Sequence, residues 1–268
     1  MLSLALAFTL GVADRGIFPD LDDKVAIALP KLVDPNLTLD ARHHVIVVWD
    51  RGRPVKVYPE KPTGAEAAEL APLVAAHPPR VVDGIPDDRD DDGIPDALDI
   101  LIGAKKVALN AASYGGDYIP IKFPGGDLPR DMGVCTDVIV RALRNAGIDL
   151  QKEIYDDIGR APRAYPMVKK RDPNIDQRRV KTMERWFQRH WEAHGTDPAS
   201  KTDPFLPGDV VFFDTFPSRP GPDHVGVVSD RIGPSGLPLI VNNWTDGFKE
   251  GEMDLLLLVP VTNRYRVK

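Results

Sequence analysis

The sequence predicts an α+β fold, in which helices open the main domain and a mostly antiparallel sheet closes it. Three observations support this prediction. The only cysteine, Cys135, stands where a loop rich in Gly, Pro and Asp gives way to an amphipathic helix. Short apolar runs typical of strands then fill the last quarter of the chain. A hairpin pattern within the first 80 residues predicts a small α+β element ahead of this domain.

The composition indicates a folded protein with a modest acidic charge. The chain has 268 residues, of which 43% are hydrophobic, and its formal net charge is −6. This length suits one large domain, or one domain with a small appendage, and the hydrophobic content is sufficient for a buried core. Lys and Arg do not cluster with aromatic residues, so nucleic acid is not an expected partner. We assume a monomer. A single cysteine excludes an intrachain disulfide but not an oxidising compartment.

The chain begins with a short apolar run, MLSLALAFTLGVA, that ends in small side chains. This run is similar to the apolar core and cleavage site of a secretory signal peptide, although the usual positive charge at its start is missing. A buried N-terminal segment is the alternative. We treat residues 1–17 as a candidate signal and expect an exported protein, periplasmic or extracellular. No other run approaches the roughly 20 apolar residues that span a bilayer, so no membrane-spanning segment is expected.

Residues 18–80 are expected to form the small α+β element. The strand-like runs 45–49 and 55–58 are separated by the sequence DRGR, a pattern typical of a β-hairpin. A helix should follow over residues 63–76, because Thr63 and Glu66 have the spacing of a capping box. No catalytic cluster is evident in this element.

An aspartate-rich segment, residues 81–99, comes next and fits the spacing of a calcium-binding loop. The expected ligands are carboxylates and one backbone carbonyl: Asp88, Asp90, Asp92, Ile94, Asp96 and Asp99. The phrase DGIPD occurs twice, and the segment resembles the calcium repeats of thrombospondin type-three stalks. We expect bound Ca²⁺ to rigidify the joint between the two parts of the chain and to take no part in chemistry. A solvated acidic linker is the alternative.

The main domain is expected to cover residues 98–268. A helix over residues 97–112 and the cysteine helix, 135–146, come first, and a long charged stretch with several prolines follows over 147–204. The expected strands cover residues 209–213, 224–229, 237–242 and 263–267. We expect them to form a mostly antiparallel sheet packed on the cysteine helix.

The order of polar residues along this domain is that of a papain-like nucleophilic site. Cys135 begins a helix, whose dipole favours a thiolate, and His224 begins a strand. In an antiparallel pair, the start of that strand lies beside the end of the next one, where Asn242 and Asn243 stand. Cys135 would attack a carbonyl, His224 would move the proton, and one asparagine would orient the imidazole. Taken alone, a single cysteine is more often a small buried hydrophobe, and a strand-edge histidine is more often structural.

Four further residues are candidates for substrate binding: Asp127, Asp137, Arg178 and Asn243. Asp127 would line the rim of the cleft. Asp137 lies on the first turn of the cysteine helix, where it could bind a substrate amine or stabilise the helix start. Arg178 and its neighbour Arg179 could bind a substrate carboxylate through two hydrogen bonds, or form an internal ion pair with Asp172 or Asp176.

Five motifs stand in order along the main domain: FPGGDLPRDMGVCTDVIVRA (123–142), GIDLQ (147–151), DPNIDQRRV (172–180), LPGDVV (206–211) and DHVGVVSD (223–230). Together they strongly resemble a bacterial family known as domain of unknown function 1287. That family is similar in fold to the NlpC-type papain-like peptidases of bacterial envelopes, which cleave peptide stems of peptidoglycan. The resemblance implies that Cys135 is the nucleophile and His224 the base. It places the third residue at Asn242, where relatives usually carry histidine.

The sequence therefore predicts an exported cysteine amidase or peptidase that acts on peptidoglycan stem peptides through Cys135, His224 and Asn242, without a catalytic cofactor. Two other classes stay open: a non-catalytic module that binds the cell wall, and a calcium-dependent envelope scaffold. Acyl or amide transfer by the same three residues is a further alternative, since the sequence does not choose between water and another acceptor.

Overall fold

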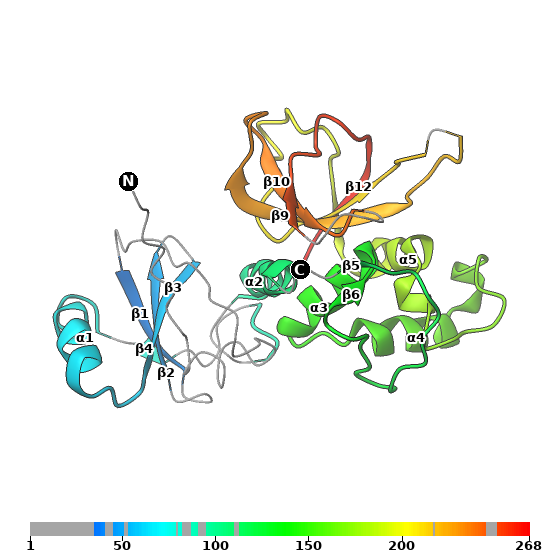
Figure 1. Ribbon diagram of the computed structural model, residues 1–268. Helices are drawn as coiled ribbons and strands as arrows, with labels where there is room; N and C mark the ends of the chain where they lie inside the picture. The colour runs from blue at the N-terminus through cyan, green and yellow to red at the C-terminus, as the bar shows by residue number, and fades with distance from the viewer. Residues whose placement is uncertain are drawn as a thin grey trace. The chain divides into compact units, whose positions relative to one another are not determined.

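In the computed structural model the chain forms two compact units, Met1–Leu98 and Asp99–Lys268 (Figure 1). The structure describes residues 35–40, 45–50, 53–78, 80–81, 87–90, 95–109, 113–216, 218–244 and 251–268. The candidate signal, residues 1–17, lies outside these ranges, as do Asp92 and Ile94 of the expected calcium loop. Within the described ranges, no helix has the length and apolar character needed to cross a membrane.

In its described residues, the first unit contains a four-stranded sheet and one complete helix. Its strands are β1 (Pro35–Asp40), β2 (Val45–Asp50), β3 (Arg53–Pro59) and β4 (Arg80–Val81), in the order β3-β2-β1-β4. The pairing of β2 with β3 confirms the expected hairpin. Helix α1 (Gly64–Ala76) confirms the expected helix, but the Thr63 side chain makes no capping hydrogen bond. The burial of Leu70 among residues of the sheet holds α1 instead.

The helices of the second unit precede most of its strands. They are α2 (Asp96–Leu109), α3 (Cys135–Asn145), α4 (Leu150–Arg160) and α5 (Val180–His190), with 3₁₀ turns at Pro162–Ala164 and Asp176–Arg178. The first turn of α2 spans the division between the units. Every residue of α3 except Arg144 is buried, so this helix is the centre of the unit.

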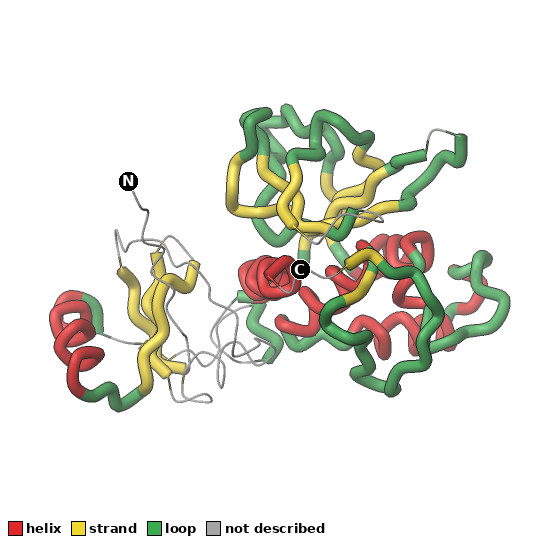
Figure 2. Tube along the Cα trace, viewed as in Figure 1, coloured by secondary structure: helices red, strands yellow, loops and turns green. Residues whose placement is uncertain are grey.

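A six-stranded antiparallel sheet is the other main part of the second unit. Its strands are β7 (Glu192–His194), β8 (Val210–Phe213), β9 (His224–Ile232), β10 (Pro238–Asn242), β11 (Gly251–Met253) and β12 (Val261–Arg266), in the order β11-β10-β9-β8-β12-β7. A separate parallel pair joins β5 (Ser113–Tyr114) to β6 (Met132–Gly133). Figure 2 shows the six-stranded sheet on one side of this unit and the helices on the other. The expected α+β class and antiparallel sheet are confirmed.

The two faces of the sheet bury different clusters of apolar side chains. Val225 and Val227 of β9 belong to the larger cluster, together with Val138 and Ile139 of α3. Val228, one position further along β9, belongs to a second cluster that contains Leu255 and Leu256. This alternation is what a period of two residues requires when both faces of a sheet are covered. It fixes the register of β9 and hence the place of its first residue, His224.

Candidate functional site

The candidate nucleophile, Cys135, is the first residue of α3 and is only 3% exposed. Val134 precedes it in extended conformation, and its backbone N–H donates to Oδ2 of Asp137 at 2.7 Å. This contact satisfies one of the N–H groups that a helix start leaves without a partner. The cysteine sulfur lies near the backbone N–H of Val225, the residue that follows His224. The helix start and the start of β9 therefore meet at the thiol.

The thiol is protonated in this closed arrangement. Burial raises the pKa of Cys135 to about 12, although nearby backbone N–H groups of Val225 and Thr136 act in the opposite direction. The helix dipole alone favours a thiolate. The structure shows that desolvation of a fully buried sulfur outweighs that effect.

The candidate base, His224, is held by a hydrogen bond to Asn242. Its Nε2 lies 3.1 Å from Oδ1 of Asn242, and the Nδ2 of that asparagine donates to the carbonyl of Ile240 at 3.0 Å. Because a carbonyl can only accept a hydrogen bond, the Ile240 carbonyl fixes which end of the Asn242 amide faces the imidazole. Nε2 of a neutral His224 must then carry the proton, and Nδ1 is left as the acceptor. Burial lowers the pKa of His224 to about 4, so the imidazole is neutral at pH 7.

Aromatic rings and a close strand pair enclose His224. The Trp244 ring meets the imidazole edge-on, with centroids 4.7 Å apart, and Phe213 lies on another side at 6.3 Å. A Cβ at Gly226 would lie 2.8 Å from the Val241 carbonyl oxygen, so only glycine lets β9 approach β10 this closely. Within the described residues no hydrogen bond joins Cys135 to His224. The two side chains are thus a neutral thiol and a neutral imidazole.

The two asparagines that the sequence left as alternatives have different partners. Asn242 contacts His224, whereas Asn243 donates through Nδ2 to the carbonyl of Gly133 at 3.2 Å. Gly133 lies two residues before Cys135, so Asn243 ties the end of β10 to the cysteine segment. Its Oδ1 is buried, and no hydrogen-bond partner for it lies in the described part of the chain.

Two of the expected substrate-binding residues bind each other. Nε of Arg178 lies 3.0 Å from Oδ1 of Asp137, and both side chains are buried. Arg178 also donates to the carbonyls of Gly115 and Asp117. The internal ion pair weighed from the sequence therefore exists, but its partner is Asp137. The ion pair between Arg179 and Asp176, at 3.3 Å, agrees with the alternative that the sequence offers.

Asp127 also has partners within the protein. Its carboxylate accepts hydrogen bonds from Nε of Arg141 at 3.0 and 3.1 Å and forms an ion pair with Arg144 at 3.3 Å. Both arginines belong to α3. Asp127 thus holds the loop that precedes the cysteine against the helix that the cysteine begins.

The described part of the aspartate-rich segment shows protein partners for two of the expected calcium ligands. The Asp96 carboxylate accepts from the Arg89 backbone N–H at 3.0 Å and forms an ion pair with its side chain at 2.9 Å. The Asp99 side chain is hydrogen-bonded to Asn145 of α3. Asp88 and Asp90 are described, and no cluster of three or more His, Cys, Asp or Glu side chains suited to a metal was found in the described ranges. The calcium prediction stays untested.

Three features near the site were not anticipated from the sequence. They are the Trp244 ring against His224, the Arg178–Asp137 pair, and a pocket lined by lysines beside Asp223. Trp244 directly follows the two asparagines, so its position in the chain was a usable signal. The ion pair and the pocket join segments about 40 residues apart and had no local signal.

The second unit is thus an α+β unit with a buried cysteine at a helix start and a His–Asn pair on neighbouring strands. The chain belongs to the family described as domain of unknown function (DUF1287), whose family profile matches residues 101–267. It is 38% identical over 160 residues to the uncharacterized protein YijF of Escherichia coli (strain K12), covering 58% of this chain and 75% of that protein. No solved structure matches the chain. The expected family is therefore confirmed, and the match lies within the second unit.

Proposed function

We propose that this protein is a cysteine amidase or peptidase with a papain-like fold, in which Cys135 is the nucleophile, His224 the base and Asn242 its orienting partner. The observation that carries the proposal is the hydrogen bond between Nε2 of His224 and Oδ1 of Asn242. It selects the imidazole tautomer whose Nδ1 can accept a proton, and Val225 brings that histidine's strand to the cysteine sulfur. A base held by a third group beside a nucleophile is the arrangement that acyl transfer requires.

In the proposed reaction the Cys135 sulfur forms a bond to the amide carbon, and the thiol proton moves to Nδ1 of His224. Backbone N–H groups at the start of α3 stabilise the oxyanion. The C–N bond then breaks, and the leaving amine takes the proton from Nδ1. Water attacks the thioester with His224 again as base, which releases the acid and restores the thiol. Another acceptor in place of water would give the transfer reaction.

We further propose that the amide lies in a peptidoglycan stem peptide and that the protein is exported to the periplasm or cell exterior. Support comes from the motif resemblance to envelope peptidases and from the apolar run at residues 1–13. Binding of Ca²⁺ by residues 81–99 is a separate proposal. It predicts that millimolar CaCl₂ raises the melting temperature of the wild type but not of an Asp88→Asn/Asp90→Asn variant.

The rate of Cys135 alkylation by iodoacetamide between pH 4 and 10 tests the catalytic pair. We expect the wild type to react at least roughly tenfold faster at pH 7 than His224→Ala, because a positioned base assists removal of the thiol proton. His77→Ala, a histidine substitution at the end of α1 in the first unit, is the matched control and should react like the wild type. Equal rates for wild type and His224→Ala that rise together with pH would overturn the proposal.

A non-catalytic wall-binding module is favoured by one observation. Cys135 is buried, its pKa is raised to about 12, and no hydrogen bond to His224 is present among the described side chains. The same experiment separates the two functions, since a module of this kind has an inert thiol at every pH. Its Cys135→Ala variant would bind isolated sacculi as tightly as the wild type, whereas an enzyme would also release new peptide termini from them.

A further inference from the structure

We propose that a cationic pocket beside His224 binds a carboxylate-bearing part of the substrate, so that the substrate is an acidic peptide. This inference rests on the proposed function and names the substrate class of that site. The pocket has a volume of about 720 Å³ and lies entirely within the second unit. Its lining includes four cationic residues: Lys169, Lys170, Arg179 and Lys181.

The positive charge of the cationic pocket is largely available to a ligand. Lys169 and Lys181 are exposed, and neither forms an ion pair with any side chain that the structure describes. Arg179 pairs with Asp176 at 3.3 Å but remains 51% exposed. Asp223, the carboxylate in the lining, already has hydrogen-bond partners: its Oδ1 accepts from the backbone N–H and from the hydroxyl of Thr215. The pocket therefore keeps a net positive charge.

Both walls of the pocket are linked to the candidate catalytic residues through neighbouring residues. One wall begins at Arg179, and the carbonyl of the preceding Arg178 accepts a hydrogen bond from the Thr136 hydroxyl at 3.0 Å. Thr136 is the neighbour of Cys135. The other wall ends at Asp223, the residue before His224. The pocket lining thus includes the chain neighbours of Arg178, which holds the Cys135 segment, and of His224.

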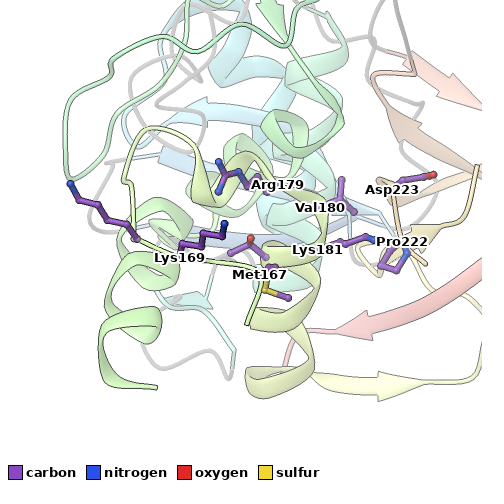
Figure 3. Close-up of a pocket in the computed structure, with 9 residues that line it drawn as sticks. Met167, Lys169, Arg179, Val180, Lys181, Pro222 and Asp223 are labelled. Carbon is purple, nitrogen blue, oxygen red and sulfur yellow. The ribbon is translucent and has the colours of Figure 1, made fainter. Parts of the chain in front are cut away.

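The lining combines charged and apolar contacts in a way that suits a peptide. Figure 3 shows Lys169 and Arg179 on one side of Val180, while Lys181 extends on the other side towards Pro222. Cations separated in this way can each meet a carboxylate, and a guanidinium binds one through two hydrogen bonds. Met167, Val180 and Pro222 give the pocket an apolar wall for aliphatic parts of a chain. Peptide carboxylates match these features better than a compact phosphate, which needs its cations at one point.

Calorimetric binding tests the inference without turnover when the Cys135→Ala protein is used. The probes are triglutamate, its neutral counterpart N-acetyl-triglutamine amide, and inorganic tripolyphosphate. We expect triglutamate to bind at least roughly tenfold more tightly than the neutral peptide, and less tightly as NaCl is raised. A Lys169→Glu/Lys181→Glu variant should lose roughly tenfold or more of that affinity, since each exposed contact is replaced by repulsion. Lys201→Glu, a single charge reversal outside the pocket, should alter it less than about twofold.

Three results would overturn the inference: equal binding of the neutral peptide, unchanged affinity in the Lys169→Glu/Lys181→Glu variant, or tripolyphosphate binding roughly tenfold tighter than triglutamate. A Lys169→Gln/Lys181→Gln variant provides the same comparison if charge reversal disturbs folding. Alkylation of Cys135 is measured independently. A reactive thiol with no preference for triglutamate refutes the acidic-substrate inference alone, and charge-dependent binding with an inert thiol refutes only the cysteine chemistry.

Discussion

Replacing Arg178 with methionine should destabilise the second unit by about 3–5 kcal/mol, because it leaves a buried carboxylate without its cation. The side chains of Arg178 and Asp137 are 2% and 5% exposed, and Nε and Oδ1 lie 3.0 Å apart. The substitution also removes hydrogen bonds to the carbonyls of Asp117 at 2.9 Å and Gly115 at 3.3 Å, worth about 1 kcal/mol each. Protonation of Asp137 limits the loss, since burial already raises the pKa of its carboxyl.

Urea unfolding followed by tryptophan fluorescence measures this loss, because Trp186 and Trp191 lie in the same core as α3. In a double-mutant cycle with Asp137→Asn, the sum of the stability losses of the two single variants should exceed the loss in the double variant by more than about 1 kcal/mol. Arg179→Met is the control. Its ion pair with Asp176 is half-exposed on the arginine side, so it should cost no more than about 1 kcal/mol. Strictly additive losses, or an Arg178→Met loss as small as that of the control, would refute the reasoning.

The pairing of β9 with β10 gives three further expectations. Acidification from pH 7 to 4 should lower the free energy of unfolding by about 3 kcal/mol through His224, because its folded pKa of about 4 lies below the unfolded value of about 6.5. This stability is complete above pH 6.5 and is lost as the pH falls towards 4. His224→Gln should reduce the dependence of stability on acid in urea titrations. Gly226→Ala should lower stability by about 1–3 kcal/mol, since its Cβ would lie 2.8 Å from the Val241 oxygen; an unchanged thermal midpoint would contradict the close approach. Asn242→Leu removes the acceptor of the His224 proton and should slow Cys135 alkylation at pH 7 as His224→Ala does, whereas a wild-type rate would show that Asn242 does not orient the base.

Local patterns predicted most of the elements that position the candidate site. The cysteine helix was expected over residues 135–146 and observed as Cys135–Asn145, and the strand that begins at His224 was located correctly. Both depend on periodicity and on a change in residue type at the element's start, which a single sequence displays directly. Helix α4 lies in the stretch that was described only as charged and proline-rich. Its buried Leu150, Ile154 and Ile158 are spaced four apart, a signal that would have located it.

Contacts between distant segments were beyond local reasoning. The sequence offered Asp172 and Asp176 as partners of Arg178 because they are near in the chain, but the partner is Asp137, 41 positions away. Local patterns could not predict the protonation state of Cys135 for a related reason. A helix start is visible in the sequence, whereas the burial that raises the thiol pKa comes from a core that includes residues about 90 positions further on, such as Val225 and Val227.

The two pKa shifts constrain how the proposed chemistry proceeds. With values of about 12 for Cys135 and about 4 for His224, moving the thiol proton to the imidazole in the closed site would cost on the order of 11 kcal/mol, before the attraction between the resulting charges is counted. A preformed thiolate–imidazolium pair is therefore not the resting state. Proton transfer must accompany formation of the sulfur–carbon bond, so that negative charge develops on the carbonyl oxygen beside the α3 N–H groups and not on a buried sulfur. Reaction of the thiol, with iodoacetamide or with an amide carbonyl, therefore depends on His224 accepting the proton as the sulfur forms its new bond.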